Sequence, residues 1–252
     1  MRRHPGIVMR TIRPFTLALA SAVLLVACDG GGAANPGGAS VPASAPPAAV
    51  AGAGGMQSVT KVLQSAQLSG NLPLTLYVGA DYCPFCASMR WPLVKALSRF
   101  GTFSGLGQRQ STAGVDGFPS LATYDFNRAT YRSQYVAFQA VETADADGNP
   151  LQQPDATQAS LINQFDPSGG IPFIFVAGRY AAQLPYSPSL LEGRTFEQIR
   201  DDIDGANPDP LGQAIDQEAD VITALICSSD SMQPATACST SQVQRLVTAI
   251  PS

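Results

Sequence analysis

Two spacings of apolar residues alternate along the chain after residue 55. Residues 74–78 alternate as a strand does, and residues 85–100 carry apolar side chains at every third or fourth position, as one face of a helix does. A short segment, 79–82, leads from the strand into the sequence Cys-Pro-Phe-Cys at 83–86. The pattern therefore predicts that this cysteine pair lies where a strand ends and a helix begins.

The rest of the pattern predicts further helices and strands in alternation. Helical spacing occurs at 59–66, 156–165, 195–203, 211–226 and 243–247. Extended segments are expected at 121–126, 135–141 and 173–176, with a polar connection at 127–132 and a hairpin turn at 177–178. Strands interleaved with helices indicate an α/β sheet whose faces are both covered.

The first 27 residues have the features of a secretory signal. Four arginines without any acidic residue precede an apolar run of 13 residues at 15–27, which is short of the ~20 residues that a membrane-spanning helix needs. Residues 25–28, Leu-Val-Ala-Cys, resemble the lipobox of bacterial lipoproteins. That resemblance implies that Cys28 is acylated and becomes the new N-terminus. The alternative is an ordinary cleaved signal, or an uncleaved anchor, that happens to contain a cysteine.

Residues 29–55 consist almost entirely of Gly, Ala, Pro and Ser, a composition that cannot form a core. As a flexible coil, a segment of this length has an r.m.s. reach of about 30 Å. We therefore predict a signal peptide over 1–27, an acylated Cys28 with a tether over 28–55, and one folded domain over 56–252. The domain would be extracytoplasmic, facing the periplasm or at the cell surface, and anchored to a membrane by lipid.

Charge and histidine content exclude several classes of function. The chain has 15 basic and 19 acidic residues, and removal of the four signal arginines leaves 11 against 19, a net charge of −8. Nucleic acid is therefore not an expected partner, because phosphate binding needs clustered Lys and Arg. The single histidine, His4, lies in the segment expected to be removed. The mature chain would then lack Ser-His-Asp and Cys-His nucleophiles and histidine metal sites.

The cysteine pair at the helix start is suited to redox chemistry. Helix N-terminal N–H groups stabilise a thiolate at Cys83, Cys86 lies one turn further on, and Pro84 suits the first helical position. A purely structural disulfide is the alternative. A zinc site would need Cys227 and Cys238 as further ligands, but the ten residues between them do not fit the usual spacing of two to four. We expect no metal and no cofactor.

The other two cysteines have a simpler interpretation. Cys227 ends a predicted helix and Cys238 follows a polar loop, so a structural disulfide would stabilise the fold by about 3 kcal/mol. A second redox site is the alternative. The four cysteines other than Cys28 form an even number, which fits an oxidising compartment.

Two residues near the pair have competing interpretations. Trp91 is expected to pack in or beside the core rather than to contact substrate. Asp81 could affect the stability of the thiolate, or it could be a loop or capping residue, and we do not assign it a catalytic role.

Several separated motifs occur in order: 79–91, 96–105, 171–174, 186–188 and 226–227. Together they resemble, from about Met56 to Cys238, a family catalogued only as domain of unknown function number 929. The family is regarded as thioredoxin-like. The resemblance implies a thioredoxin-like fold with a helical or extended insertion and a C-terminal helical extension. It also implies Cys83 and Cys86 as the redox pair and Pro172 as a cis-proline opposite them, whereas a trans proline opening an edge strand is the alternative.

Within the same motifs, Pro92 stands where relatives are expected to have Ala. This departure affects the geometry of the helix. The resemblance implies no substrate.

The expected function is thiol–disulfide exchange with protein thiols outside the cytoplasm, carried out by Cys83, Cys86 and Pro172, in a direction that the sequence leaves open. One rival is a redox-inactive lipoprotein of the same fold that serves as a binding or scaffold module. The other is a peroxide-reducing enzyme, which is disfavoured because no Thr/Arg constellation is recognisable near the pair.

Overall fold

The computed structural model describes residues 56, 58–182 and 186–250. The predicted signal segment, Cys28 and the tether lie outside these residues. Within the described part of the chain, no helix has both the length and the apolar character needed to cross a membrane.

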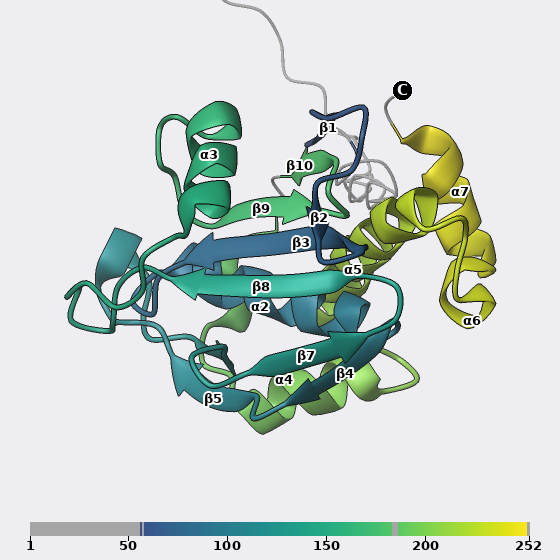
Figure 1. Cartoon of the computed structure of the whole chain (residues 1–252). Helices are drawn as coiled ribbons and strands as arrows, with labels where there is room; N and C mark the ends of the chain where they lie inside the picture. Colours follow the sequence, from purple (N-terminus) through teal and green to yellow (C-terminus); the bar gives the residue numbers. More distant parts are fainter. Residues whose placement is uncertain (1–55, 57, 183–185, 251–252) are drawn as a thin grey trace, which may run out of the picture. The chain divides into compact units, whose positions relative to one another are not determined.

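Six strands form the main sheet (Figure 1). They are β1 (Val59–Lys61), β2 (Leu68–Ser69), β3 (Leu72–Gly79), β8 (Ala137–Glu142), β9 (Phe173–Val176) and β10 (Tyr180–Ala182). β10 lies between β1 and β9, and β3 pairs with β9, β8 and β2. β3 and β8 are parallel, with Gly79 opposite Glu142, and the other pairings are antiparallel.

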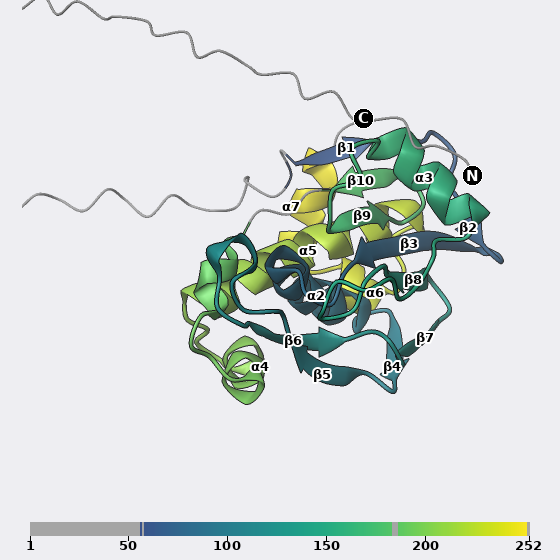
Figure 2. The ribbon, with the colours of Figure 1, turned by 90° about the vertical axis from the view of Figure 1, so that its left-hand side faces the viewer.

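Helices cover both faces of this sheet, as Figures 1 and 2 show. α2 (Pro84–Leu97) and α5 (Pro210–Ser229) cover one face, and α3 (Ala156–Phe165) covers the other. Successive side chains of β3 therefore meet different helices. Leu74, Leu76 and Val78 cluster with Leu161 of α3, whereas Tyr77 belongs to the cluster that includes α2 and α5. Because both faces are covered, β3 is buried along most of its length, and the fold is of the α/β class.

α2 begins at the cysteine pair because its first residues suit a helix start. Cys83 is the N-cap, with an extended backbone, and Pro84 occupies the first turn, where a missing N–H leaves no hydrogen bond unmade. The helix continues through Pro92 to Leu97. The sequence pattern predicted this helix and its starting point correctly.

Between α2 and β8 the chain forms two small two-stranded sheets. β4 (Gly101–Ser104) pairs with β7 (Thr130–Ser133), and β5 (Gly107–Gln110) pairs with β6 (Ala122–Asp125), with a short 3-10 helix η1 (Val115–Gly117) between β5 and β6. Their aromatic side chains pack on one another and on β8. Phe103 contacts Phe126, Tyr131 and Phe138 at ring-centroid distances of 4.8 to 6.4 Å.

The structure corrects two predictions of local structure. The segment 59–66 is not helical: Val59 faces the α2 and α5 side, while Val62 and Leu63 pack against the α3 side, and the N–H groups of Val62 and Leu63 donate to the carbonyl of Arg179. Its helical spacing thus reflects contacts on two faces of a sheet. The polar connection predicted at 127–132 is also too long, because β7 already begins at Thr130. A turn precedes this strand, in which the N–H of Ala129 donates to the carbonyl of Phe126.

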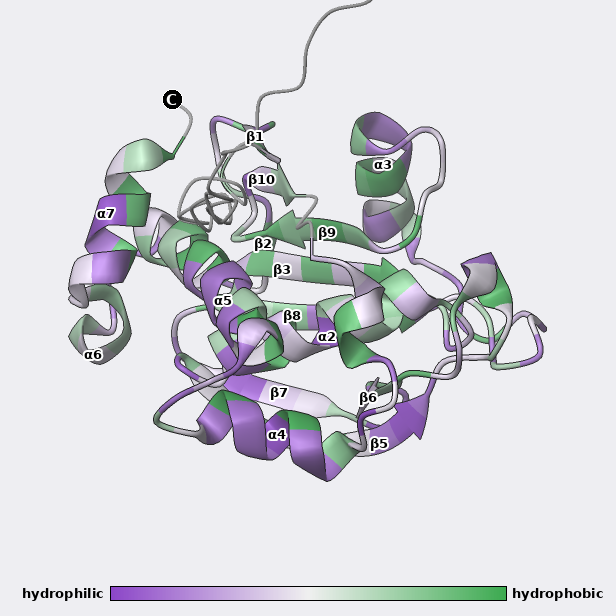
Figure 3. Ribbon diagram, turned by 180° about the vertical axis from the view of Figure 1, so that it is seen from behind, coloured by the Kyte–Doolittle hydropathy of each residue, from purple (hydrophilic) through white to green (hydrophobic). Residues whose placement is uncertain are grey.

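The C-terminal third is mostly helical. A 3-10 helix η2 (Pro188–Leu191) is followed by α4 (Phe196–Asp204), α5, α6 (Ala235–Cys238) and α7 (Ser241–Ala249). α4 and α7 each mix hydrophilic and hydrophobic positions, whereas β9 is hydrophobic (Figure 3). α4 buries Phe196, Ile199 and Ile203, and α7 buries Val243 and Leu246. The two helices therefore each pack one apolar side.

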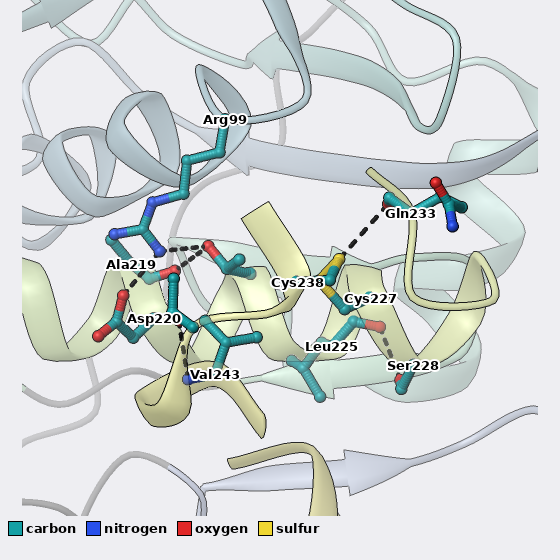
Figure 4. Close-up of a disulfide and its surroundings, with 11 residues drawn as sticks. Arg99, Ala219, Asp220, Leu225, Cys227, Ser228, Gln233, Cys238 and Val243 are labelled. Carbon is teal, nitrogen blue, oxygen red and sulfur yellow. Dashed lines mark hydrogen bonds and ion pairs between the residues drawn. A yellow bond between two sulfur atoms is a disulfide. The ribbon is translucent and has the colours of Figure 1, made fainter. Parts of the chain in front are cut away.

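Cys227 and Cys238 form a disulfide, with their Cα atoms 5.6 Å apart (Figure 4). Both cysteines are fully buried. Cys227 lies in the last turns of α5, and Cys238 ends the short helix α6 rather than an unstructured loop. The bridge thus attaches α6, and α7 after it, to the long helix.

Candidate functional site

Cys83 and Cys86 are free thiols at the first turn of α2. The backbone N–H of Cys86 donates to Sγ of Cys83, with a distance of 3.1 Å between nitrogen and sulfur. Cys83 is 4% exposed, and Cys86 is completely buried. The outer cysteine is thus the one whose sulfur acts as the helix cap.

Electrostatics distinguish the two thiols. The pKa of Cys83 is lowered, mainly because the side chain of Cys86 hydrogen-bonds to its sulfur. The Cys86 N–H and the charge of Arg90 also lower this pKa, whereas burial raises it. The pKa of Cys86 is raised well above its ordinary value, first by burial and then by Cys83. This asymmetry favours Cys83 as the nucleophile, because the thiolate is the reactive form.

The Ile171–Pro172 peptide bond is cis, and it immediately precedes β9. β9 lies between β10 and β3, so Pro172 does not open an edge strand, contrary to the alternative considered from the sequence. Ile171 and Pro172 line a cavity of about 1040 Å³ together with Phe85 and Met89 of α2. The start of α2 and the cis proline thus face one cavity.

An aromatic residue on the rim of this cavity is unusually exposed. Phe85, between the two cysteines, is 43% exposed. Its ring packs edge to face on that of Phe118, with the ring centroids 5.7 Å apart. Phe118 also lines the cavity. An apolar surface is therefore available beside the cysteine pair.

A buried ion pair lies behind the cysteines and was not expected from the sequence. Arg90 of α2 is fully buried, and its Nε and Nη2 donate to the two carboxylate oxygens of Glu142 at 3.0 and 2.9 Å. The guanidinium also lies 5.7 Å from the ring centroid of Tyr77, whose hydroxyl is buried without a hydrogen-bond partner among the described residues. One sequence signal could have drawn attention to Arg90: it is a charged residue four positions after Cys86, within an otherwise largely apolar helix.

Asp81 belongs to a different polar cluster. Its carboxylate is paired with Arg109 and accepts from Nδ2 of Asn127 at 3.2 and 3.3 Å. Its backbone N–H donates to the carbonyl of Ala144. These contacts fit the loop role considered for Asp81, in which it joins β3 to the β5–β6 hairpin.

Trp91 is a core residue, as expected. It is fully buried, its Nε1 donates to the carbonyl of Ala122 at 3.1 Å, and its ring packs on Tyr124 and Phe196. It thereby connects α2 with β6 and α4. Among the described residues, no group of three or more His, Cys, Asp or Glu side chains is placed to hold a metal ion.

Comparisons with known proteins identify one family. Its model, described as Domain of unknown function (DUF929), matches residues 58–169. The match includes both cysteines of the pair and Glu142 but ends before Pro172, so it is shorter than the stretch over which the motifs resemble the family. No curated protein and no solved structure matches the chain. The DUF929 family model thus matches residues 58–169, and it is the family that the sequence motifs resemble.

Proposed function

We propose that this protein is a thiol–disulfide oxidoreductase that acts on protein thiols through Cys83 and Cys86. The observation that carries the proposal is the position of Sγ of Cys83 at the N-cap of α2, where it accepts the N–H of Cys86 at 3.1 Å. A helix N-terminus stabilises negative charge, so this geometry favours a thiolate at Cys83.

A thioredoxin-like fold, the finer part of the proposal, is supported by the order of the elements. β3, α2 and β8 form a parallel unit, α3 crosses to the other face, and the hairpin of β9 and β10 is followed by the long helix α5. A cis proline stands just before β9, where the family resemblance puts one. The segment 101–133 is then the expected insertion, and α6 and α7 are the C-terminal helical extension.

Cys83, Cys86 and Pro172 have separate roles in the proposed reaction. The Cys83 thiolate attacks one sulfur of a substrate disulfide, forms a mixed disulfide, and releases the other substrate sulfur as a thiolate, which takes up a proton. Cys86, after losing its own proton, attacks Sγ of Cys83 and releases the second substrate thiol. Two electrons pass to the substrate and leave a Cys83–Cys86 disulfide. The reverse sequence oxidises a substrate dithiol. Pro172 shapes the surface on which the substrate segment docks, and the exchange requires no cofactor.

The proposed location is outside the cytoplasm, with the domain tethered to a membrane through lipid on Cys28. The Cys227–Cys238 disulfide supports this location, because such bonds persist in oxidising compartments. Partners would then be the thiols or disulfides of other extracytoplasmic proteins.

Trapping of the mixed disulfide tests the proposed reaction. Cys86→Ser should accumulate an adduct with a peptide disulfide, because the resolving thiol is missing, and mass spectrometry should place the adduct on Cys83. Cys83→Ser, the matched control, should form no adduct at position 86, which is fully buried. Absence of an adduct in both variants would favour the redox-inactive scaffold.

A further inference from the structure

Arg90 and Glu142 form a buried pair of charges behind the proposed redox site. The side chain of Arg90 is 0% exposed, and that of Glu142 is 1% exposed. Glu142 comes from β8, where it pairs with Gly79 at the end of β3, one residue before Ala80. The charge pair thus lies at the level where the chain leaves the sheet toward Cys83.

Two geometric relationships connect Arg90 with the cysteines. Arg90 follows Cys86 by four residues in α2, so the two side chains leave the same face of the helix. In addition, the carbonyl oxygen of Ala80 accepts both the N–H of Cys83, at 3.3 Å, and Nη2 of Arg90, at 3.0 Å. A shared acceptor atom places the guanidinium next to the backbone of Cys83.

The hydrogen-bonding capacity of Arg90 is not fully used by these partners. Nε and Nη2 are bonded to Glu142 and Ala80, whereas Nη1 is buried and has no hydrogen-bond partner within the described residues. A buried N–H group without a partner is unfavourable and calls for a physical reason. A negative charge that exists in only one state of the site, such as a thiolate, would provide that reason.

Other charged groups near the pair are themselves compensated. Both carboxylate oxygens of Glu142 accept hydrogen bonds from Arg90, and Asp81 is paired with Arg109. Tyr77 faces the guanidinium with its ring, and burial raises its pKa well above the ordinary value, so the hydroxyl stays neutral. Arg90 opposes the effect of burial on the pKa of Cys86 and lowers the pKa of Cys83.

We propose that Arg90 is a positioning residue of the exchange reaction, whose buried charge stabilises the Cys83 thiolate and the thiolate that forms on Cys86 as it leaves the disulfide, and so makes that disulfide a stronger oxidant. The inference rests on the proposed function and assigns a direction to it. A disulfide whose reduced form is stabilised has a higher reduction potential. The site would therefore accept electrons from a substrate dithiol.

In this direction the site oxidises a substrate dithiol to a disulfide. A substrate thiolate attacks Sγ of Cys83 in the Cys83–Cys86 disulfide, and Cys86 leaves as a thiolate beside Arg90. The second substrate thiol, deprotonated, attacks the substrate sulfur of the mixed disulfide and releases Cys83 as a thiolate. Two electrons pass from the substrate, now a disulfide, to the pair. Of the two protons lost by the substrate thiols, one is taken up by Cys86 and the other is released. A second protein disulfide reoxidises the pair by the reverse exchange.

Three variants of the full-length protein test the inference by equilibration with glutathione. Arg90→Gln combined with Glu142→Gln removes both charges and should lower the oxidising equilibrium constant at least tenfold, a fall in potential of about 30 mV. Glu142→Gln alone leaves the cation uncompensated and should shift the constant in the opposite direction. The distant pair Arg99→Gln with Asp220→Asn is the matched control, because it removes a partly buried ion pair that joins the end of α2 to α5, and it should leave the constant unchanged (Figure 4).

If Arg90 had only a structural role, its replacement would lower the free energy of unfolding. The double variant and Glu142→Gln alone would then not shift the reduction potential in opposite directions. The inference is overturned if Glu142→Gln alone and the double variant shift the equilibrium constant with glutathione in the same direction. It is also overturned if the constants of both variants stay within twofold of the parent value. If the double variant does not fold, the sign of the shift in Glu142→Gln alone decides. Failure of the parent protein to exchange with glutathione at all would instead contradict the proposed function.

Discussion

The hydroxyl of Tyr186 donates a hydrogen bond to the backbone carbonyl oxygen of Ser88 in α2. In an uninterrupted helix that oxygen would accept the N–H of residue 92, but Pro92 has no N–H. Tyr186 therefore supplies the donor that the proline removes. This contact explains how α2 continues through Pro92, and it fixes the wall of the cavity that Ser88 and Tyr186 both line.

Removal of the Tyr186 hydroxyl should lower the stability of the protein, because the Ser88 carbonyl then has no donor. Tyr186→Phe is expected to lower the free energy of unfolding by about 1 kcal/mol or more, because a buried acceptor loses its partner. In a Pro92→Ala background, position 92 regains its own N–H, and the same change should cost less. Urea denaturation of the four proteins forms a double-mutant cycle. Equal losses in both backgrounds would show that Tyr186 does not replace the missing N–H.

The Cys227–Cys238 disulfide should be structural and resistant to reduction. Replacement of both cysteines by alanine is expected to lower the free energy of unfolding by about 3 kcal/mol, because the bridge closes a short loop in the unfolded chain. Partial reduction followed by alkylation and mass spectrometry should label Cys83 first. Labelling of Cys227 and Cys238 before Cys83 would reverse the roles assigned to the two pairs.

The lowered pKa of Cys83 predicts the pH dependence of its alkylation. The rate with iodoacetamide should rise with pH and reach half of its maximum below the ~8.5 typical of a free thiol, because the thiolate forms earlier. In Cys83→Ser, the remaining Cys86 should react slowly and only at higher pH, since burial raises its pKa. A midpoint for Cys83 at or above that of a free thiol would rule out the proposed activation.

Glu218 of α5 predicts a change of stability with pH. Burial raises its pKa to about 7. Its folded-state pKa thus exceeds the unfolded value of about 4.3, so the folded state holds the proton more tightly. The stability that the protonated Glu218 carboxyl adds to the folded state is fully present below about pH 4.3 and is lost as pH rises to about 7.

Glu218→Gln should therefore raise the free energy of unfolding at pH 8 by about 2–3 kcal/mol and flatten the profile between pH 4 and 7. Denaturation at a series of pH values measures both effects. The exposed residue Glu197 offers a control, because Glu197→Gln should leave the profile unchanged. A Glu218→Gln profile that coincides with that of the parent would contradict a buried, protonated carboxyl.

Lipidation of Cys28 is a prediction that lies outside the described residues. Cys28→Ser should release the protein from membranes and abolish labelling by fatty acid, because the acylated residue is lost. Cys83→Ser should retain both, which separates loss of the anchor from loss of a thiol. Unchanged labelling in Cys28→Ser would exclude the lipid anchor.

Most of the helices and the central strands could be predicted from the sequence, because each depends on a local pattern. The start of α2, for example, follows from Pro84 and the apolar positions after it. The two small sheets between α2 and β8 were harder to predict. Their strands β4 and β5 are short and only partly buried, so the alternation of polar and apolar residues is weak.

The charge pair at the site could not be predicted for a different reason. Arg90 and Glu142 are separated by 52 positions in the sequence, and only the parallel pairing of β3 with β8 brings them together. Neither residue alone distinguishes a buried charge from one at the surface. By contrast, the cysteines at 83 and 86 are one helical turn apart, so their proximity was evident from sequence alone.

The reduction potential of the Cys83–Cys86 pair decides between a redox-active site and a structural disulfide. The protein is equilibrated with a series of glutathione ratios and quenched with acid, and the state of the two cysteines is read by alkylation and mass spectrometry. A redox-active pair should have a potential between about −270 and −120 mV, the range of known exchange proteins. A value below about −300 mV, typical of structural disulfides, or no exchange at all, would contradict the proposed function.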